Sequence, residues 1–397
     1  MPEALEQLSL LDLSGDTARH VILAAGTNEV YQGHPTTVLT QTGKLLCVWT
    51  LGHGGLCGPA AESLDGGRTW TRIDNRLPSA YSAIHQNCPT LQKMALPDGR
   101  ERLLVFSAKK ITTEYTEHTE CQIAKTRTAH PLGIVYSDDD GASWREAQSA
   151  KLSAMMPPTG FMPLRDGTVA LFGQMRLDAS VVTDGPEDDQ VVWMATSRDG
   201  LAWGEPRIVA SAPEKNLCEP FAMRSPDGRE IALLLRENRH AGRSMMCFSR
   251  DEGATWTEPV DTCWGLTGDR HEGVVLPDGR VFIAFRDRAS NSPTYGHYVA
   301  WVGTWDDLRN ASPGQCRIKL LHSHAGEEGI ENASFLGDTG YSGVELLADG
   351  EILCTTYVKY WPDARRHSVV SSRVPMQFLN WKLENGTGNT CTLATFS

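Results

Sequence analysis

The residues best suited to chemistry lie at the two ends of one predicted hairpin. Arg270, His271 and Glu272 precede an apolar run, Arg286 follows a second run, and Pro277-Asp278-Gly279-Arg280 stands between the runs. An Asp-Gly pair between β-rich runs predicts a tight turn, because glycine accepts the positive φ that such turns need. The outer ends of a hairpin lie side by side. We therefore expect these charged groups to form a cluster that can serve as a site.

The pattern of apolar run, glycine turn and apolar run occurs six times. Units of this size built from strands predict a propeller. Val21–Ala25 is then left over, and we expect it to close the ring as the outer strand of the last blade. Residues 375–397 are an unassigned tail of a single domain spanning 1–397. The turn glycines, 51 to 71 residues apart, are Gly43, Gly99, Gly167, Gly228, Gly279 and Gly350, and the predicted blades are 34–73, 85–147, 159–208, 218–260, 270–320 and 341–374.

A second repeat has the form S-x-D-x-G-x-x-W. It occurs at Ser63–Trp70, Ser137–Trp144 and Ser249–Trp256, with a shortened copy at Ser197–Trp203. The Asp side chain is expected to cap backbone N–H groups of a turn, and the Trp to pack between neighbouring sheets. These aspartates are therefore predicted to be structural. The repeat resembles the Asp-box, or BNR repeat, of the sialidase (neuraminidase) superfamily. That resemblance implies an all-β, six-bladed propeller of four-stranded antiparallel blades.

Composition limits the partners. The 397 residues carry a net charge of −12 with no Lys/Arg-rich run, which argues against nucleic acid or an anionic membrane as a partner. The first 16 residues lack the pattern of a signal peptide, so we expect a cytoplasmic protein, although a trimmed secreted or periplasmic chain would look the same. The ten cysteines include no C-x-x-C pair and are predicted to be reduced. No cofactor is predicted.

In each predicted blade, the start of the first strand and the end of the second meet at the central mouth. Any one polar residue there could simply be an exposed strand end. Bulky hydrogen-bonding groups from all six blades, however, predict a substrate site. The candidates are His34, His53, His85, Asn87, Arg176, Glu219, Arg236, Arg270, His271, Glu272, Arg286, Tyr341 and Tyr357.

The resemblance to sialidases implies roles for some of these residues. It makes Tyr341, in D-T-G-Y-S-G, the nucleophile, and Glu219, in C-E-P-F, the carboxylate that activates it. Arg236 and Arg286 correspond to two of the family's arginines, which bind the substrate carboxylate. A neutral phenol suits an anionic substrate, because it approaches with less repulsion than a carboxylate would.

Two family positions differ in this chain. The first arginine of the family cluster is replaced by His34, and the loop Gly52–Pro59, where an acid/base Asp is expected, contains His53 and no carboxylate. His34, His53 and His85 therefore suggest imidazole acid/base chemistry. They lack a spacing typical of metal ligands, so no metal is predicted.

The leading prediction is a sialidase-like glycoside hydrolase that acts on an anionic, carboxylate-bearing sugar. His53 or His34 would then transfer protons. One alternative is a polysaccharide lyase or a non-sialic glycosidase that uses His, Tyr and Arg on the same fold. Another is a glycan-binding propeller without activity, which the missing Asp favours. The sugar, its linkage and the oligomeric state stay open at this stage.

Overall fold

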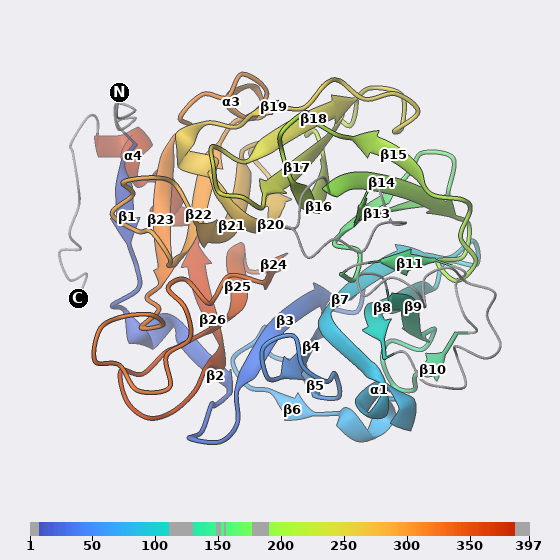
Figure 1. Cartoon of the computed structure of the whole chain (residues 1–397), viewed down its shortest axis with the longest axis horizontal. Helices are drawn as coiled ribbons and strands as arrows, with labels where there is room; N and C mark the ends of the chain where they lie inside the picture. The colour runs from blue at the N-terminus through green and yellow to red at the C-terminus, as the bar shows by residue number, and fades with distance from the viewer. Residues whose placement is uncertain (1–7, 111–129, 148–151, 155, 177–189, 386–397) are drawn as a thin grey trace.

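Six antiparallel sheets surround a central axis, as the cartoon of the whole chain shows (Figure 1). The computed structural model describes residues 8–110, 130–147, 152–154, 156–176 and 190–385. In four sheets the strands follow one another outward from the axis in chain order, and in the other two an N-terminal strand, β1 or β2, is added at the outer edge. The predicted six-bladed propeller of four-stranded antiparallel blades is confirmed.

The first three blades begin within two residues of the predicted starts. Blade two has an additional short strand, β11 (Ser153–Ala154), which pairs with β9. The polar segment 112–128 of blade two and the acidic segment 184–189 of blade three lie outside the described residues. The strands are β3 (Gln32–Leu39), β4 (Leu45–Leu51), β5 (Ala60–Ser63) and β6 (Thr71–Arg72); β7 (His85–Ala95), β8 (Glu101–Lys109), β9 (His130–Ser137) and β10 (Arg145–Glu146); and β12 (Gly160–Pro163), β13 (Val169–Arg176), β14 (Gln190–Ser197) and β15 (Arg207–Ala210).

The last three blades also match the prediction, and blade six closes the ring. The N-terminal strand β2 (His20–Ala24) pairs antiparallel with β26, as expected for the segment at 21–25. Blade five gains β1 (Leu10–Asp12), which pairs parallel with β23 and was not predicted. The strands are β16 (Leu217–Arg224), β17 (Ile231–Glu237), β18 (Met245–Ser249) and β19 (Val260–Asp261); β20 (Gly268–Val275), β21 (Val281–Asp287), β22 (Tyr298–Gly303) and β23 (Cys316–Leu321); and β24 (Ser342–Leu346), β25 (Glu351–Val358) and β26 (Ser368–Pro375).

Short helices fill the remaining connections. α1 (Ser79–Ala83) precedes blade two, and the 3₁₀ turns are η1 (Thr17–Arg19), η2 (Asp74–Arg76) and η4 (Trp264–Leu266). The segment at 304–307, which resembles a degenerate turn repeat in sequence, instead caps α3 (Trp305–Arg309) through a reciprocal Thr304–Asp307 capping box. The unassigned tail begins with a helix, α4 (Met376–Asn385), and Arg280 donates to the backbone oxygen of Leu379 in it.

The aspartate turns have the expected hydrogen bonds. Asp251 accepts from the backbone N–H of Thr255 at 2.8 Å and from its hydroxyl at 2.5 Å, and Asp65 and Asp139 make the same pair of contacts. The Trp256 ring of blade four packs edge-on against Phe172 of blade three at 5.8 Å. The repeat therefore joins neighbouring blades. The eight cysteines in the described residues are free and buried, whereas Cys121 and Cys391 lie outside them. In the described part of the chain, no helix is long and apolar enough to span a membrane.

The inner strands of four blades contain a bulge near their first residues. The register shifts in β3, β7, β16 and β20. At each shift the backbone is left-handed, with φ between 46° and 64°. A bulge turns a side chain away from its regular alternation, and bulges are common beside active sites. The residues with positive φ are His34, Asn87, Cys88, Glu219 and Arg270.

Prediction for the inner strands. Glu345 on β24 accepts a hydrogen bond from the Thr37 hydroxyl on β3 at 3.0 Å. Burial raises the pKa of Glu345 to about 7. In the folded protein the Glu345 carboxyl therefore keeps its proton up to about pH 7, whereas in the unfolded chain it loses the proton above the ordinary pKa of a glutamate. The contribution of the protonated carboxyl to stability is thus full at low pH and is lost as the pH rises through 7.

Between pH 5 and pH 8 the unfolding free energy should therefore fall less in Glu345→Gln than in the wild type. The difference should be about 1–2 kcal/mol, given the partial exposure of the side chain. Urea denaturation at several pH values measures this difference. Glu29→Gln, at an exposed position, is the control. Equal pH profiles for wild type and Glu345→Gln would contradict the prediction.

Candidate active site

Tyr341 and Glu219 are in direct contact, although 122 positions separate them in sequence. The Tyr341 hydroxyl donates to Oε1 of Glu219, and one Arg236 guanidinium nitrogen donates to both carboxylate oxygens, at 3.0 and 3.1 Å. Burial raises the pKa of Tyr341 well above its usual value, and the Glu219 charge raises it further. Burial alone would raise the pKa of Glu219 too, but Arg236 and other neighbours lower it. A neutral phenol therefore donates to an anionic carboxylate.

The backbone brings this tyrosine to the axis. Glu219 has φ 47° at the bulge of β16, and Gly340, just before Tyr341, has φ 98°. A Cβ at residue 340 would lie 2.5 Å from the Cβ of Arg286, so only glycine fits there. The guanidiniums of Arg270 and Arg286 lie 5.3 and 5.9 Å from the centre of the Tyr341 ring. Tyr341 is thus surrounded by cationic groups that would stabilise developing negative charge on its oxygen.

Asp269 binds a group of arginines at the inner end of blade five. Its Oδ2 accepts from Nε of Arg286 and from Nε of Arg288, both at 2.9 Å, and its Oδ1 lies 3.0 Å from Nε of Arg236. His240 Nε2 lies 2.8 Å from the same Oδ1. Burial alone would raise the pKa of Asp269, but Arg236 and Arg286 hold it well below its usual range. The carboxylate is therefore a permanent anion between three cations.

A second buried carboxylate, Asp338, lies in the loop between β23 and β24. Asp338 accepts from the Tyr31 hydroxyl at 2.7 Å and from the Tyr357 hydroxyl at 3.0 Å, and His53 Nδ1 lies 3.1 Å from its Oδ1. Burial acts to raise its pKa, but the hydrogen bond from His53 and the nearby His367 lower it strongly. The His53 side chain is 51% exposed and that of Asp338 is 0% exposed, so the imidazole, and not the carboxylate, faces solvent.

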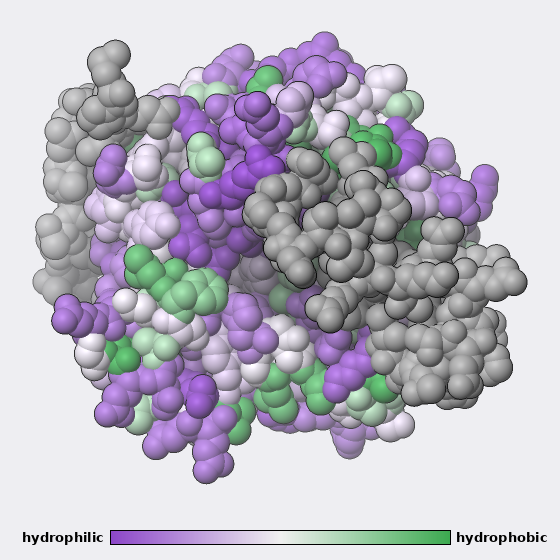
Figure 2. Space-filling view, in the orientation of Figure 1, coloured by the Kyte–Doolittle hydropathy of each residue, from purple (hydrophilic) through white to green (hydrophobic). Residues whose placement is uncertain are grey.

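Aromatic rings connect Tyr341 with the His53–Asp338 pair. The His34 ring lies 4.9 Å from that of Tyr341, 4.7 Å from that of Tyr357 and 4.8 Å from that of His53. His34 is 1% exposed, and burial lowers its pKa well below the usual value, so it is neutral. The exposed Phe335 ring packs edge-on against His53 at 5.6 Å. Figure 2 shows hydrophilic side chains gathered around the inner end of blade five on this face.

Not every predicted residue joins this centre. His85 lies inside blade two, with Nδ1 2.6 Å from the Ser107 hydroxyl and Nε2 3.2 Å from Glu146. His271 packs on Phe285, and its Nε2 lies 3.0 Å from the backbone oxygen of Leu266. Glu272 is on the inner strand β20 below the mouth, where burial raises its pKa to about 8.

Two further candidates, Asn87 and Arg176, lie near the ends of strands in blades two and three. Asn87 lies at the bulge of β7, and its side-chain amide contacts Met156 Sδ at 3.2 Å. Arg176 ends β13, but its side chain is outside the described residues.

Sequence reasoning missed several residues of the centre. Asp269 directly precedes the predicted cluster at 270–272, and Asp338 is three positions before Tyr341, at the start of the motif D-T-G-Y-S-G. The missing signal was the pairing of Asp269 with Arg286 across the hairpin, which depends on the bulge at 270–271. The other residues missed are Tyr31, His240, Arg288, Phe335 and His367.

The comparison with known families agrees with this architecture. The sequence profile of the BNR repeat-like domain matches residues 101–321, more than half of the chain. The chain belongs to the BNR repeat-like domain family. No curated protein matches this BNR repeat-like chain in a sequence search.

Solved structures share the fold at low sequence identity. A protein of unknown function from Dyadobacter fermentans is 16% identical, covers 89% of this chain and 98% of its own, and has a TM-score of 0.60. The α-L-arabinofuranosidase Arb93A from Fusarium graminearum, with an iminosugar inhibitor, is 12% identical; the match covers 90% of this chain and 98% of that one, with a TM-score of 0.60. The intramolecular trans-sialidase from Ruminococcus gnavus, with oseltamivir carboxylate, is 14% identical; the match covers 90% of this chain and 97% of that one, with a TM-score of 0.56. The sialidase-like fold is thus confirmed for this BNR repeat-like protein.

Prediction for Asp269. Asp269→Asn should lower the unfolding free energy by roughly 3–5 kcal/mol, because it leaves buried guanidiniums without their shared anion. In Asp269→Ala, which leaves space where the buried carboxylate stood, added formate should recover part of the loss in thermal unfolding by binding the guanidiniums.

Asp287→Asn is the matched control. Asp287 is also buried, but it contacts one arginine, Arg317, and otherwise accepts from hydroxyl and backbone donors. The Asp287→Ala variant should show less formate-dependent recovery than Asp269→Ala, because Asp287 contacts one arginine and not three. A loss below about 1 kcal/mol for Asp269→Asn would contradict the role of Asp269.

Proposed function

We propose that this protein is a retaining glycoside hydrolase that uses Tyr341 as its nucleophile and Glu219 as the base that activates it. The observation that carries the proposal is the hydrogen bond from the Tyr341 hydroxyl to Glu219 at the centre of the propeller. Glycosidases among the proteins of similar fold support the reaction class by analogy.

In the first step the Tyr341 oxygen attacks the anomeric carbon while its proton moves to Glu219. The bond to the leaving oxygen breaks, and that oxygen takes a proton from a general acid. In the second step a water loses its proton to the same acid/base group and attacks the anomeric carbon. The Tyr341 oxygen leaves and takes back the proton held by Glu219. Arg236 keeps Glu219 oriented in both steps through its two hydrogen bonds.

His53 is the group best suited to act as the acid/base. It is half exposed, contacts the Asp338 carboxylate through Nδ1 at 3.1 Å, and so presents Nε2 away from that contact. An anionic partner that orients an imidazole and stabilises its charged form is the arrangement of catalytic His–Asp pairs. His34 is buried and neutral, so we assign it the positioning of Tyr341 and His53 through ring contacts.

The charges of the centre support an anionic sugar. Arg236, Arg270, Arg286 and Arg288 contribute four positive charges, while Glu219, Asp269 and Asp338 contribute three negative ones, which leaves one net positive charge. Arg270 is buried, and its Nε has no hydrogen-bond partner among the described residues. A substrate carboxylate would satisfy Arg270 and balance this charge. A sialoside-like sugar is therefore the first candidate.

One observation favours a neutral sugar as the second candidate. Arg236 and Arg286, the arginines expected to bind a substrate carboxylate, already contact Asp269 of the protein itself. Asp269 would then act as a built-in substitute for that carboxylate. The exposed Phe335 beside His53 offers an aromatic face for a neutral sugar ring. An arabinofuranoside, the substrate type named for one protein of similar fold, is the test compound for this case.

Prediction for Tyr341. Tyr341→Phe should lower kcat at least about 1,000-fold on the substrate found by a screen of aryl sialosides, uronate oligosaccharides and aryl arabinofuranosides, because the nucleophilic oxygen is removed. Proton NMR of the first product should show retained anomeric configuration for the wild type. Mass spectrometry should show the addition of one water.

Tyr81→Phe removes a buried hydroxyl in α1 and is the control, with activity expected to stay unchanged. Full activity of Tyr341→Phe would overturn the assigned nucleophile. A product without added water that absorbs ultraviolet light would indicate elimination, and glycan binding without turnover would indicate a lectin-like protein. Either of these results would overturn the hydrolase.

Prediction for Arg270. Arg270→Gln should lower kcat/KM on an anionic substrate by roughly 10- to 100-fold, because a charged hydrogen bond to the carboxylate is lost. The same variant should leave kcat/KM on a neutral aryl glycoside within about threefold. An equal loss on both substrates would contradict charge recognition by Arg270.

A further inference from the structure

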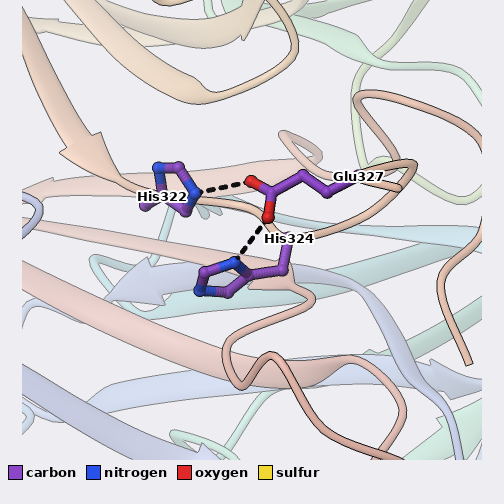
Figure 3. A group of neighbouring side chains, drawn as sticks. All are labelled: His322, His324 and Glu327. Carbon is purple, nitrogen blue, oxygen red and sulfur yellow. Dashed lines mark hydrogen bonds and ion pairs between the residues drawn. The ribbon is translucent and has the colours of Figure 1, made fainter. Parts of the chain in front are cut away.

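A second group of potential ligands lies outside the centre, at the start of the loop that follows β23. His322 Nε2 is 2.7 Å from Glu327 Oε1, and His324 Nδ1 is 2.9 Å from Glu327 Oε2. One ligand atom from each residue lies within 4.8 Å of the other two. Figure 3 shows both imidazole rings directed at the two oxygens of the same carboxylate. All three side chains are partly buried and reach solvent.

The backbone of this loop holds the three side chains in place. The His324 N–H donates to the backbone oxygen of Lys359 on the neighbouring blade at 2.9 Å, and the His297 ring packs on that of His322 with centres 4.2 Å apart. Gly326 turns the chain back at φ 75°, where a Cβ would meet the backbone nitrogen of Leu336 at 2.3 Å. Only glycine fits this turn, and it returns Glu327 to the two histidines.

We propose that His322, His324 and Glu327 form a binding site for a divalent transition-metal ion, with Zn²⁺ the best match. Two imidazoles and one carboxylate are a ligand set that Zn²⁺ accepts, with a water in the fourth position. Ligand atoms of a tetrahedral zinc site lie about 3.3 Å apart for bonds of about 2.0–2.1 Å. The two present contacts, at 2.7 and 2.9 Å, would open by about half an ångström to that separation, and the two imidazole nitrogens, which lie within 4.8 Å of each other, would close to it. Partial exposure gives the ion a path to the site.

A neighbouring lysine, Lys319, contacts one of the proposed ligands. Lys319 Nζ lies 2.9 Å from His322 Nδ1, and an ammonium can only donate, so the ring proton is on Nε2 and faces Glu327. Binding of the metal at Nε2 moves that proton to Nδ1, and Lys319 must turn away. Asp12 Oδ2 lies 3.8 Å from Nζ and can receive it. Lys319 therefore competes with the metal, both through this hydrogen bond and through its charge.

The proposed ion would cross-link the first turn of the segment from β23 to β24. This segment also contains Phe335 and Asp338, which lie in the candidate active site. The ion would stabilise the loop by fixing its N-terminal end. None of its three ligands contacts Tyr341 or Glu219 in the described structure. The metal site is thus independent of the proposed hydrolase reaction.

The experiment measures Zn²⁺ binding to the metal-free protein by isothermal titration calorimetry, and Co²⁺ binding by visible absorption. Because thiolates also bind these ions, all variants carry Cys121→Ser and Cys391→Ser, the two cysteines outside the described residues. The wild-type ligand set should bind one equivalent of Zn²⁺, raise the Tm, and give the intense visible band of tetrahedral Co²⁺.

Ligand variants separate this site from a simple ion-pair cluster. His324→Ala and Glu327→Gln should each weaken Zn²⁺ binding at least about tenfold. Because glutamine still accepts hydrogen bonds, the Glu327→Gln protein should be folded as the wild type is, which circular dichroism checks. Lys319→Met should tighten Zn²⁺ binding about tenfold by removing a like charge. His20→Ala, at a partly buried histidine that contacts Tyr360, is the matched control and should change nothing.

Two results would overturn the site. The first is no saturable binding of Zn²⁺ or Co²⁺ to the wild-type ligand set. The second is binding that His324→Ala, Glu327→Gln and Lys319→Met all leave unchanged. Loss of hydrolase activity in a Tyr341 variant bears on neither result, because the readouts are binding and spectra.

Discussion

The pairing of Asp269 with Arg236, Arg286 and Arg288 is the interaction on which the centre of this molecule depends. Guanidiniums gathered at the axis would repel one another and could not stay buried without a shared anion. Asp269 supplies that anion from the same strand end as Arg270, and the oxygens of one carboxylate hold arginines from blades four and five. With Arg236 fixed in this way through Nε, its Nη1 can hold Glu219 toward Tyr341.

The same centre contains backbone strain at the inner strands of four blades. Four inner strands have a bulge near their start, and each bulge contains a polar residue in a left-handed conformation. A left-handed conformation is costly for residues other than glycine, and it persists only where the surrounding sheet enforces it. Here the regular outer strands and the aspartate turns between blades supply that support.

Two histidines stand at positions where the resemblance to sialidases predicts an arginine and an aspartate. His34 stands where an arginine is expected, and the neutral imidazole packs between Tyr341 and Tyr357 as a guanidinium would not. His53 stands where an acid/base Asp is expected, and Asp338 from the distant β23–β24 loop contacts it. The histidine of one loop thus contacts a carboxylate that comes from another loop.

The sequence by itself determined the six blades, their bounds, the closing strand and the structural turns, because these depend on local periodicity and on glycines that only certain turns require. It also placed Tyr341, Glu219, Arg236 and Arg286 at the mouth. Only the tertiary structure decided which polar groups meet. Whether Asp269 pairs with Arg286, and whether His85 and His271 turn into their own blades, depends on bulges that insert one extra residue into β20 and two into β7. Such shifts arise from packing around the whole ring, and no local pattern in the chain encodes them.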